Sequence, residues 1–319
     1  MKSLTLPLSF ILLATSCSQV EIHNVTVTRY LGDRQAAVSL TFDDGMLCHY
    51  TDVAPALEAN GLRGTFWIIG ANMDREEPEY PWMTWEQVAD LSHRGHEISN
   101  HTWNHPNLTQ LSPDDLRWEV EYCDSVITSF TGLKPRTFCY PYNAMSPEVV
   151  AFCNQGRVGT RTYQEAQGQA ESHQTAESMQ AWLDHIIQTG EWGVTMTHGT
   201  TYGWDKWDEP QLLYDFFVQL NAASDSVWTA PFAEVASYIT ERDNIEFSWT
   251  MGNRCLVITP LLHDLDTSLY TQPLTLRIDG TFSGINPRAE QNGHSLTIIN
   301  RDSVLLLDIN LTDEVILKW

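Results

Sequence analysis

The chain has 319 residues, of which 42% are hydrophobic and 18% charged, so it can form one large globular domain with a smaller second one. Its formal net charge is −23 with only 18 lysines and arginines, which excludes an extended basic surface for nucleic acid and disfavours polyanionic substrates. Neutral substrates and cationic products are compatible with this charge.

The N-terminus has the pattern of an export signal. Lys2 is followed by the apolar run LTLPLSFILLA, which is too short for a comfortable transmembrane helix, and then by small residues before Cys17. Small residues leading to a cysteine are typical of a bacterial lipobox. We therefore expect residues 1–17 to direct export to the cell envelope, with a lipid on Cys17 as the membrane anchor; plain secretion is the alternative. Residues 18–35 are predicted to be a short tether.

From Ala36 onward, strand-like runs alternate with helical segments. Ser112-Pro113 and Ser146-Pro147 each place a cap residue before a first-turn proline, and Thr84 with Gln87 has the spacing of a capping box. The strand-like runs lie at 38–42, 64–70, 97–100, 137–141, 156–162, 192–198 and 226–230. Seven strands separated by helices predict a parallel sheet that closes into a barrel-like α/β fold over residues 36–242.

The pattern changes after Arg242. Residues 243–319 contain short β-type runs separated by turn residues, with no helical stretch between them. This segment is predicted to be a small all-β module of the sandwich type. Five cysteines remain after Cys17, with no CxxC pair, and this odd, scattered set predicts mostly buried thiols rather than disulfides or a zinc–cysteine site.

The first candidate site residues follow the strand that begins at Ala36. Its apolar run ends in Asp43-Asp44-Gly45. Because neighbouring side chains on a strand point opposite ways, the two carboxylates are suited to different tasks, one on a cation and the other on a water. Taken alone, Asp-Gly is more often an ordinary turn.

A histidine pair forms the second candidate. His101 and His105 follow the run at 97–100, in the same layer as Asp44, and one helical turn or a tight loop would bring both rings to one side. Two imidazoles and one carboxylate make a three-ligand site with open positions, as in catalytic divalent-metal sites. The cation would lower the pKa of a water, and Asp43 is the candidate for taking its proton. By itself an HxxxH pair is more often a surface or core feature.

The motifs TFDDG, HTWNH, YPYN and THG, in this order at strand ends, resemble those of the polysaccharide deacetylases, the nodulation-protein-B homology group of the carbohydrate esterases. The resemblance covers residues 36–242. It implies a distorted (β/α)7 barrel and a metal-dependent hydrolase, with zinc as the expected ion, that removes acetyl groups from an oligo- or polysaccharide. We expect N-acetyl groups to be the target; an O-acetyl esterase of the xylan type and a catalytically impaired glycan-binding lipoprotein are the alternatives.

The resemblance also assigns roles to individual residues. Asp43 resembles the catalytic base and His198 the acid that protonates the leaving group. Tyr142 lies where the family uses a backbone N–H to stabilise the oxyanion. The residues that resemble the family's metal ligands are Asp44, His101 and His105.

Two departures from the family pattern affect this site. Cys139 and Asn143 replace the arginine and glycine of the third motif, and the fourth motif has no counterpart after Arg161. We hypothesise that Arg161 supplies the missing guanidinium beside Asp43; a surface arginine is the alternative. The sequence contains no evident partner for His198.

Tryptophans near these motifs have two interpretations. Flat aromatic faces suit sugar rings, so Trp103, Trp204 and Trp207 are candidates for a substrate groove. Ordinary core packing explains each of them equally well.

Overall fold

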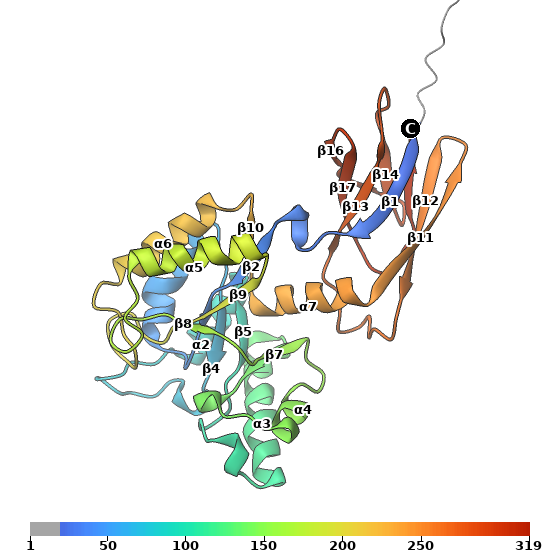
Figure 1. Ribbon diagram of the computed structural model, residues 1–319. Coiled ribbons are helices and arrows are strands. Elements are labelled where there is room, and N and C mark those ends of the chain that lie inside the picture. The colour runs from blue at the N-terminus through green and yellow to red at the C-terminus, as the bar shows by residue number, and fades with distance from the viewer. Residues whose placement is uncertain (1–19) are drawn as a thin grey trace, which may run out of the picture.

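The computed structural model describes residues 20–319 (Figure 1). The predicted export signal and the lipobox cysteine, Cys17, lie outside the described residues. An α/β barrel and a β-sandwich lie at opposite ends of the molecule, with α7 (Phe232–Asp243) running between them (Figure 1). Among the described helices, none has both the length and the apolar content needed to cross a bilayer.

Parallel strands form the barrel. They are β2 (Ala36–Ser39), β3 (Thr41–Phe42), β4 (Thr65–Ile68), β5 (Glu97–Asn100), β6 (Thr137–Cys139), β7 (Gly159–Arg161), β8 (Glu165–Ala166), β9 (Trp192–Met196) and β10 (Val227–Thr229). Their pairing gives the orders β10-β2-β9-β8 and β3-β4-β5-β6-β7, and β2 and β3 are successive pieces of one strand joined to β9 by a bridge from Phe42 to Thr197. Within residues 20–319, β7, β8 and β10 each pair with a neighbour on one side only, so the barrel is incomplete. The predicted distorted barrel is confirmed, with β8 as an additional short strand.

Helices cover the outside of the sheet. They are α1 (Ala54–Ala59), α2 (Trp85–His93), α3 (Pro113–Thr131), α4 (Pro147–Cys153), α5 (Ala176–Thr189), α6 (Gln211–Ala222) and α7, with short turns η1 (Leu31–Asp33), η2 (His49–Val53), η3 (Gly70–Asn72), η4 (Leu108–Gln110) and η5 (Pro141–Asn143). The capping box at Thr84 and Gln87 is present as predicted, and Ser112 and Ser146 cap α3 and α4. Each of these three helices, α2, α3 and α4, thus begins where the side chain of its cap residue accepts a hydrogen bond from a free backbone N–H.

The C-terminal segment forms two antiparallel sheets. Its strands are β11 (Ile245–Gly252), β12 (Cys255–Leu262), β13 (Leu274–Thr281), β14 (Arg288–Gln291), β15 (His294–Leu296), β16 (Ile299–Arg301), β17 (Val304–Ile309) and β18 (Val315–Lys318). One sheet has the order β11-β12-β18-β14-β15 and the other includes β13-β17-β16. The predicted sandwich-like module is confirmed. All five cysteines of the described residues are unpaired, and four of them are buried.

The predicted tether at 18–35 is wrong in its central part. Residues Glu21–Val27 form β1, which pairs antiparallel with β13 and completes the second sandwich sheet. Its partner lies about 250 positions further along the chain, so no local pattern could indicate the pairing. The next residues join the sandwich to the barrel, because the Tyr238 hydroxyl on α7 lies 2.9 Å from the Thr28 hydroxyl. Tyr238 also shares an apolar core with sandwich residues such as Leu276.

Candidate active site

A cavity of about 510 Å³ opens at the carboxyl ends of the barrel strands. This is the end at which parallel α/β folds collect their functional side chains. The cavity brings together six of the seven residues predicted from the sequence, which are Asp43, Asp44, His101, His105, Tyr142 and His198. The seventh, Arg161, lies buried directly behind Asp43.

The two aspartates point in different directions, as the strand geometry predicts. Asp43 is buried and its N–H donates to the Thr197 carbonyl oxygen, which extends the pairing of β3 with β9. Asp44 then adopts a left-handed backbone with φ of 80°, and Gly45 continues it with φ of 85°. A positive φ at a non-glycine residue is strained and is common at functional sites. This turn directs the Asp44 carboxylate towards the histidine pair.

The histidine pair lies on a tight loop after β5 rather than on a helix. Thr102 and His105 both have positive φ values, of 69° and 60°. The Thr102 hydroxyl accepts a hydrogen bond from the His105 N–H at 2.9 Å. His101 donates its Nδ1–H to the Cys139 carbonyl oxygen at 2.8 Å, which leaves Nε2 unprotonated and directed into the cavity. The Nε2 atoms of His101 and His105 are 3.2 Å apart.

Glu119 on α3 fixes this loop, and the sequence analysis missed it. One carboxylate oxygen of Glu119 accepts the backbone N–H groups of Trp103 at 3.0 Å and Asn104 at 2.7 Å. The other accepts the Asn104 side-chain amide at 2.9 Å. A signal was available: Glu119 lies on the same helical face as Cys123 and Ile127, and a carboxylate on a buried apolar face requires a specific partner.

The ligand set fits a divalent cation. Asp44 Oδ1 lies 3.5 Å from His101 Nε2 and 3.9 Å from His105 Nε2, and it is buried without a hydrogen-bond partner among the described residues. Ligands at the usual zinc distances in a tetrahedral site are about 3.4 Å apart, so one ion can satisfy all three atoms. Burial lowers the pKa of His101, and burial together with the neighbouring His101 ring lowers the pKa of His105 to about 4. Both rings are therefore neutral, as metal ligands must be.

Arg161 reaches Asp43 as hypothesised. Its guanidinium donates from Nη1 to Asp43 Oδ1 at 2.8 Å and from Nη2 to Oδ2, a two-pronged pair between two buried side chains. The same Nη1 donates to the Thr41 hydroxyl at 2.8 Å, and the guanidinium lies 4.5 Å from the centre of the Trp67 ring. The alternative of a surface arginine is excluded by its exposure of 2%.

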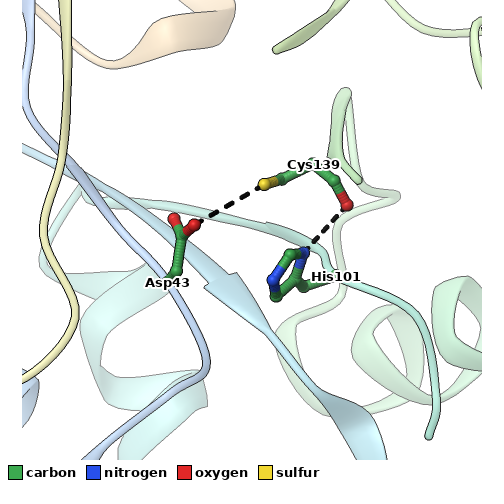
Figure 2. A group of neighbouring side chains, drawn as sticks. All are labelled: Asp43, His101 and Cys139. Carbon is green, nitrogen blue, oxygen red and sulfur yellow. Dashed lines mark hydrogen bonds between the residues drawn. The ribbon is translucent and has the colours of Figure 1, made fainter. Parts of the chain in front are cut away.

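Cys139 contacts Asp43 through its sulfur and His101 through its backbone carbonyl oxygen (Figure 2). Its Sγ lies 3.7 Å from Asp43 Oδ2 and 2.9 Å from Arg161 Nη2. Burial raises the pKa of Cys139 far above that of a free thiol, so the sulfur stays protonated. These three side chains are near enough to share an ion. A neutral thiol beside a guanidinium does not favour a second cation, so Asp44 is the carboxylate suited to a metal.

The charge state of Asp43 follows from the same contacts. Burial acts to raise the pKa of Asp43, but the Arg161 guanidinium and the nearby imidazoles outweigh it and hold the pKa well below its usual range. Asp43 is therefore an anion at neutral pH, able to accept a hydrogen bond but a weak base on its own. Proton transfer to it requires a strongly acidified donor.

His198 follows β9 and lines the cavity. Its backbone carbonyl oxygen accepts a hydrogen bond from His49 Nε2 at 2.5 Å, and its ring packs edge-to-face on Trp204 with centroids 5.0 Å apart. The Nδ1 atom of His198 is buried and has no hydrogen-bond partner among residues 20–319. This agrees with the absence of an evident partner in the sequence. No sequence signal pointed to His49, which lies on the π-helical turn η2.

Aromatic side chains flank the candidate metal site. Tyr142 has φ of 59°, and its exposed ring lies edge-to-face on His105 with centroids 4.6 Å apart. Trp204 is likewise exposed and lines the cavity beside His198. Trp207 is buried in the core, and Trp103 is partly buried against the same core and contacts Tyr122 of α3, so neither lines this cavity. Of the three tryptophans considered from sequence, only Trp204 faces the candidate site.

The fold is an α/β barrel with a candidate Asp-His-His metal site at the strand ends. Residues 32–157 match the family model of polysaccharide deacetylases. This segment of the chain is similar to the polysaccharide deacetylase family.

Individual relatives match over part of the chain. A chitin deacetylase from Amylomyces rouxii is 28% identical over 136 residues, which cover 43% of this chain and 30% of that protein. A peptidoglycan-N-acetylglucosamine deacetylase from Bacillus cereus is 29% identical over 109 residues, covering 34% of this chain and 37% of the relative. The matched part thus spans about a third of the length of these curated relatives.

Among solved structures, the Bc1960 peptidoglycan N-acetylglucosamine deacetylase aligns with a TM-score of 0.49 and 19% identity. The alignment covers 62% of this chain and 86% of that one.

Proposed function

We propose that the protein is a metal-dependent hydrolase that removes acetyl groups from a glycan, with N-acetyl groups as the main target. The observation that carries the proposal is the convergence of Asp44, His101 and His105 on one point, in a cavity also lined by Asp43 and His198. N-acetyl substrates are favoured because the relatives described above are named as chitin and peptidoglycan-N-acetylglucosamine deacetylases.

Asp44, His101 and His105 would hold a divalent cation, and two imidazole ligands favour zinc. Such an ion supplies a Lewis acid that brings the pKa of water towards neutrality and polarises a carbonyl oxygen. His101 donates its Nδ1–H to the Cys139 carbonyl oxygen, so its Nε2 atom is free to bind the ion.

The chain's own residues then divide the proton transfers. Asp43 accepts the proton of the water whose oxygen attacks the acetyl carbon, and Arg161 keeps this carboxylate ionised and fixed in direction. The backbone N–H of Tyr142 donates to the carbonyl oxygen as negative charge develops on it. His198 delivers a proton to the sugar nitrogen as the carbon–nitrogen bond breaks, which releases acetate and a free amine.

The test is acetate release from N-acetylated chitooligosaccharides, with and without a chelator. We expect turnover that is lost with chelator and restored by added zinc or another divalent transition metal. Asp43→Asn should abolish turnover while the bound metal, measured by elemental analysis, stays stoichiometric. Full activity of Asp43→Asn would overturn the role of Asp43.

An O-acetyl esterase is the alternative, because ester and amide hydrolysis need the same charge stabilisation. Acetate release from acetylated xylan, compared with chitooligosaccharides at equal acetyl concentration, separates the two. The unpartnered Nδ1 of His198 favours a second alternative, a glycan-binding protein with impaired catalysis. Stoichiometric metal without acetate release from any acetylated glycan would support that alternative.

The proposal includes a location. An enzyme acting on an envelope glycan must be exported, which is consistent with the signal-like segment 1–17. Metabolic labelling with a fatty acid, compared between the wild type and Cys17→Ser, tests the predicted lipid anchor directly.

A further inference from the structure

Helix α3 carries exposed aromatic side chains next to the histidine loop. Trp118 and Tyr122 are one helical turn apart, and their side chains are 46% and 42% exposed. The face of α3 that packs on the barrel is a different one, made by Val120, Cys123 and Ile127. Large aromatics on the solvent side of a helix add nothing to the core, and an exposed apolar cluster commonly marks a binding surface.

The aromatic rings are held in a fixed arrangement. The Trp118 and Tyr122 rings stack within 9° of parallel at a centroid distance of 5.2 Å. Trp103 packs its edge on Tyr122 at 4.6 Å. We refer to Trp103, Trp118 and Tyr122 as the α3 platform. Because Tyr122 contacts both tryptophans, its ring has little side-chain freedom left to lose on binding a ligand.

The α3 platform is continuous with the candidate metal site through the backbone. Trp103 lies between His101 and His105 in the chain, and Glu119 on α3 holds its N–H. The platform and the metal ligands are thus joined by one short loop, which Glu119 holds to α3. A long ligand with one unit in the cavity can extend over this loop onto α3.

The charges around the α3 platform restrict what it can bind. Asp114 and Asp115, both exposed, lie one turn before Trp118, and the whole chain carries −23. Phosphorylated or uronic-acid glycans are disfavoured there, whereas neutral sugars and sugars with free amines are not. The apolar faces of pyranose rings stack on tryptophan and tyrosine rings.

We infer that the α3 platform is a secondary sugar-binding surface, which holds a neutral or amine-bearing stretch of the glycan strand whose acetyl group lies in the cavity. The inference rests on the proposed function for the identity of the strand. It makes the protein selective for long chains, because a short oligosaccharide in the cavity does not reach α3.

The experiment is calorimetric binding of chitohexaose and of its dimer, chitobiose, to the purified full-length protein, with and without EDTA. We expect the wild type to bind the hexamer more tightly than the dimer. Trp118→Ala and Tyr122→Ala should each weaken hexamer binding by about fivefold or more and shift dimer binding by less than about twofold. Trp249→Ala, at a tryptophan 39% exposed on the sandwich strand β11, is the matched control and should change neither.

Equal weakening for the hexamer and the dimer, no hexamer binding by the wild type, or an equal effect of Trp249→Ala would each overturn the inference. So would a variant that binds the hexamer normally but loses self-association in sedimentation, since α3 would then be a protein interface. Acetate release is measured in parallel. If no acetate is released but hexamer binding still depends on Trp118, only the proposed function is refuted. If acetate is released but Trp118→Ala leaves hexamer binding unchanged, only the inference about the α3 platform is refuted.

Discussion

Cys139 and Arg161 are direct register partners on the adjacent parallel strands β6 and β7. Both side chains contact Asp43, and the guanidinium comes from the second of these strands. The polysaccharide deacetylases that the sequence resembles place arginine at the position of Cys139. The small thiol of Cys139 leaves room for the Arg161 side chain. The guanidinium contact with Asp43 is therefore preserved, although the arginine that makes it lies on β7 rather than β6.

This relationship predicts the outcome of a swap. Arg161→Cys should lower kcat by at least about 100-fold, because Asp43 loses the cation that keeps it ionised and oriented. Unfolding should also become easier by about 3–5 kcal/mol, the usual effect of leaving one member of a buried ion pair alone. The double variant Cys139→Arg with Arg161→Cys should regain part of the lost kcat and part of the lost free energy of unfolding. Acetate release measures the first and denaturant titration the second. A double variant no better than Arg161→Cys would show that the two positions are not equivalent.

The barrel and its site could be predicted well from the sequence because the signals there are local. Strands buried on both faces give continuous apolar runs, and Asp43 and Asp44 directly follow such a run, while His101 and His105 follow the short strand at 97–100. Arg161 required a family comparison, since only the missing arginine at Cys139 made another arginine necessary.

Other contacts depend on residues that are distant in sequence. The pairing of β1 with β13 and the hydrogen bond from His49 to the His198 carbonyl each join segments about 150 or more positions apart. A single sequence does not reveal such contacts. The role of Glu119 could be predicted only in part. Its position on the apolar face of α3 is visible in the sequence, but its partners, the N–H groups after His101, are not.

Glu119 is expected to act on the metal through the loop it holds. Glu119→Gln keeps an acceptor but removes the charge that binds two backbone N–H groups, so His105 is less well positioned. Metal affinity should fall by about 10–100-fold, as is usual when groups that orient metal ligands are altered. The measurement is competition for zinc with a chromophoric chelator. Glu121→Gln, on the exposed side of the same helix, is the control and should leave the affinity unchanged.

Metal binding should stabilise the fold in a way that depends on Asp44. An ion present at about 100 times its Kd adds about 2.7 kcal/mol to the free energy of unfolding, provided the unfolded chain does not bind it. Thermal unfolding of the wild type should therefore shift upward with zinc, and Asp44→Asn should lose most of this shift. Asp43→Asn should keep the shift, because Asp43 is paired with Arg161 rather than directed at the site. An equal loss in both variants would contradict the division of roles between the aspartates.

His49 should make stability depend on pH. Burial lowers the pKa of His49 to about 4 from an ordinary value of 6.5, so the folded chain binds a proton there less readily than the unfolded chain. The contribution of neutral His49 to the free energy of unfolding is complete above pH 6.5 and is lost as the pH falls towards 4. The total effect of such a shift is on the order of 3 kcal/mol. Urea titrations from pH 7 to pH 4 should therefore show a smaller loss of stability for His49→Gln than for the wild type.

The glutamine at position 49 keeps an N–H for the His198 carbonyl, so the two proteins differ mainly in the titrating group. His185 is exposed, and His185→Gln serves as the control because it replaces a histidine on the surface rather than a buried one. The wild type and His185→Gln should lose stability in parallel as the pH falls, and His49→Gln should diverge from both below pH 6.5. Parallel curves for all three proteins would mean that His49 can be protonated without unfolding the chain.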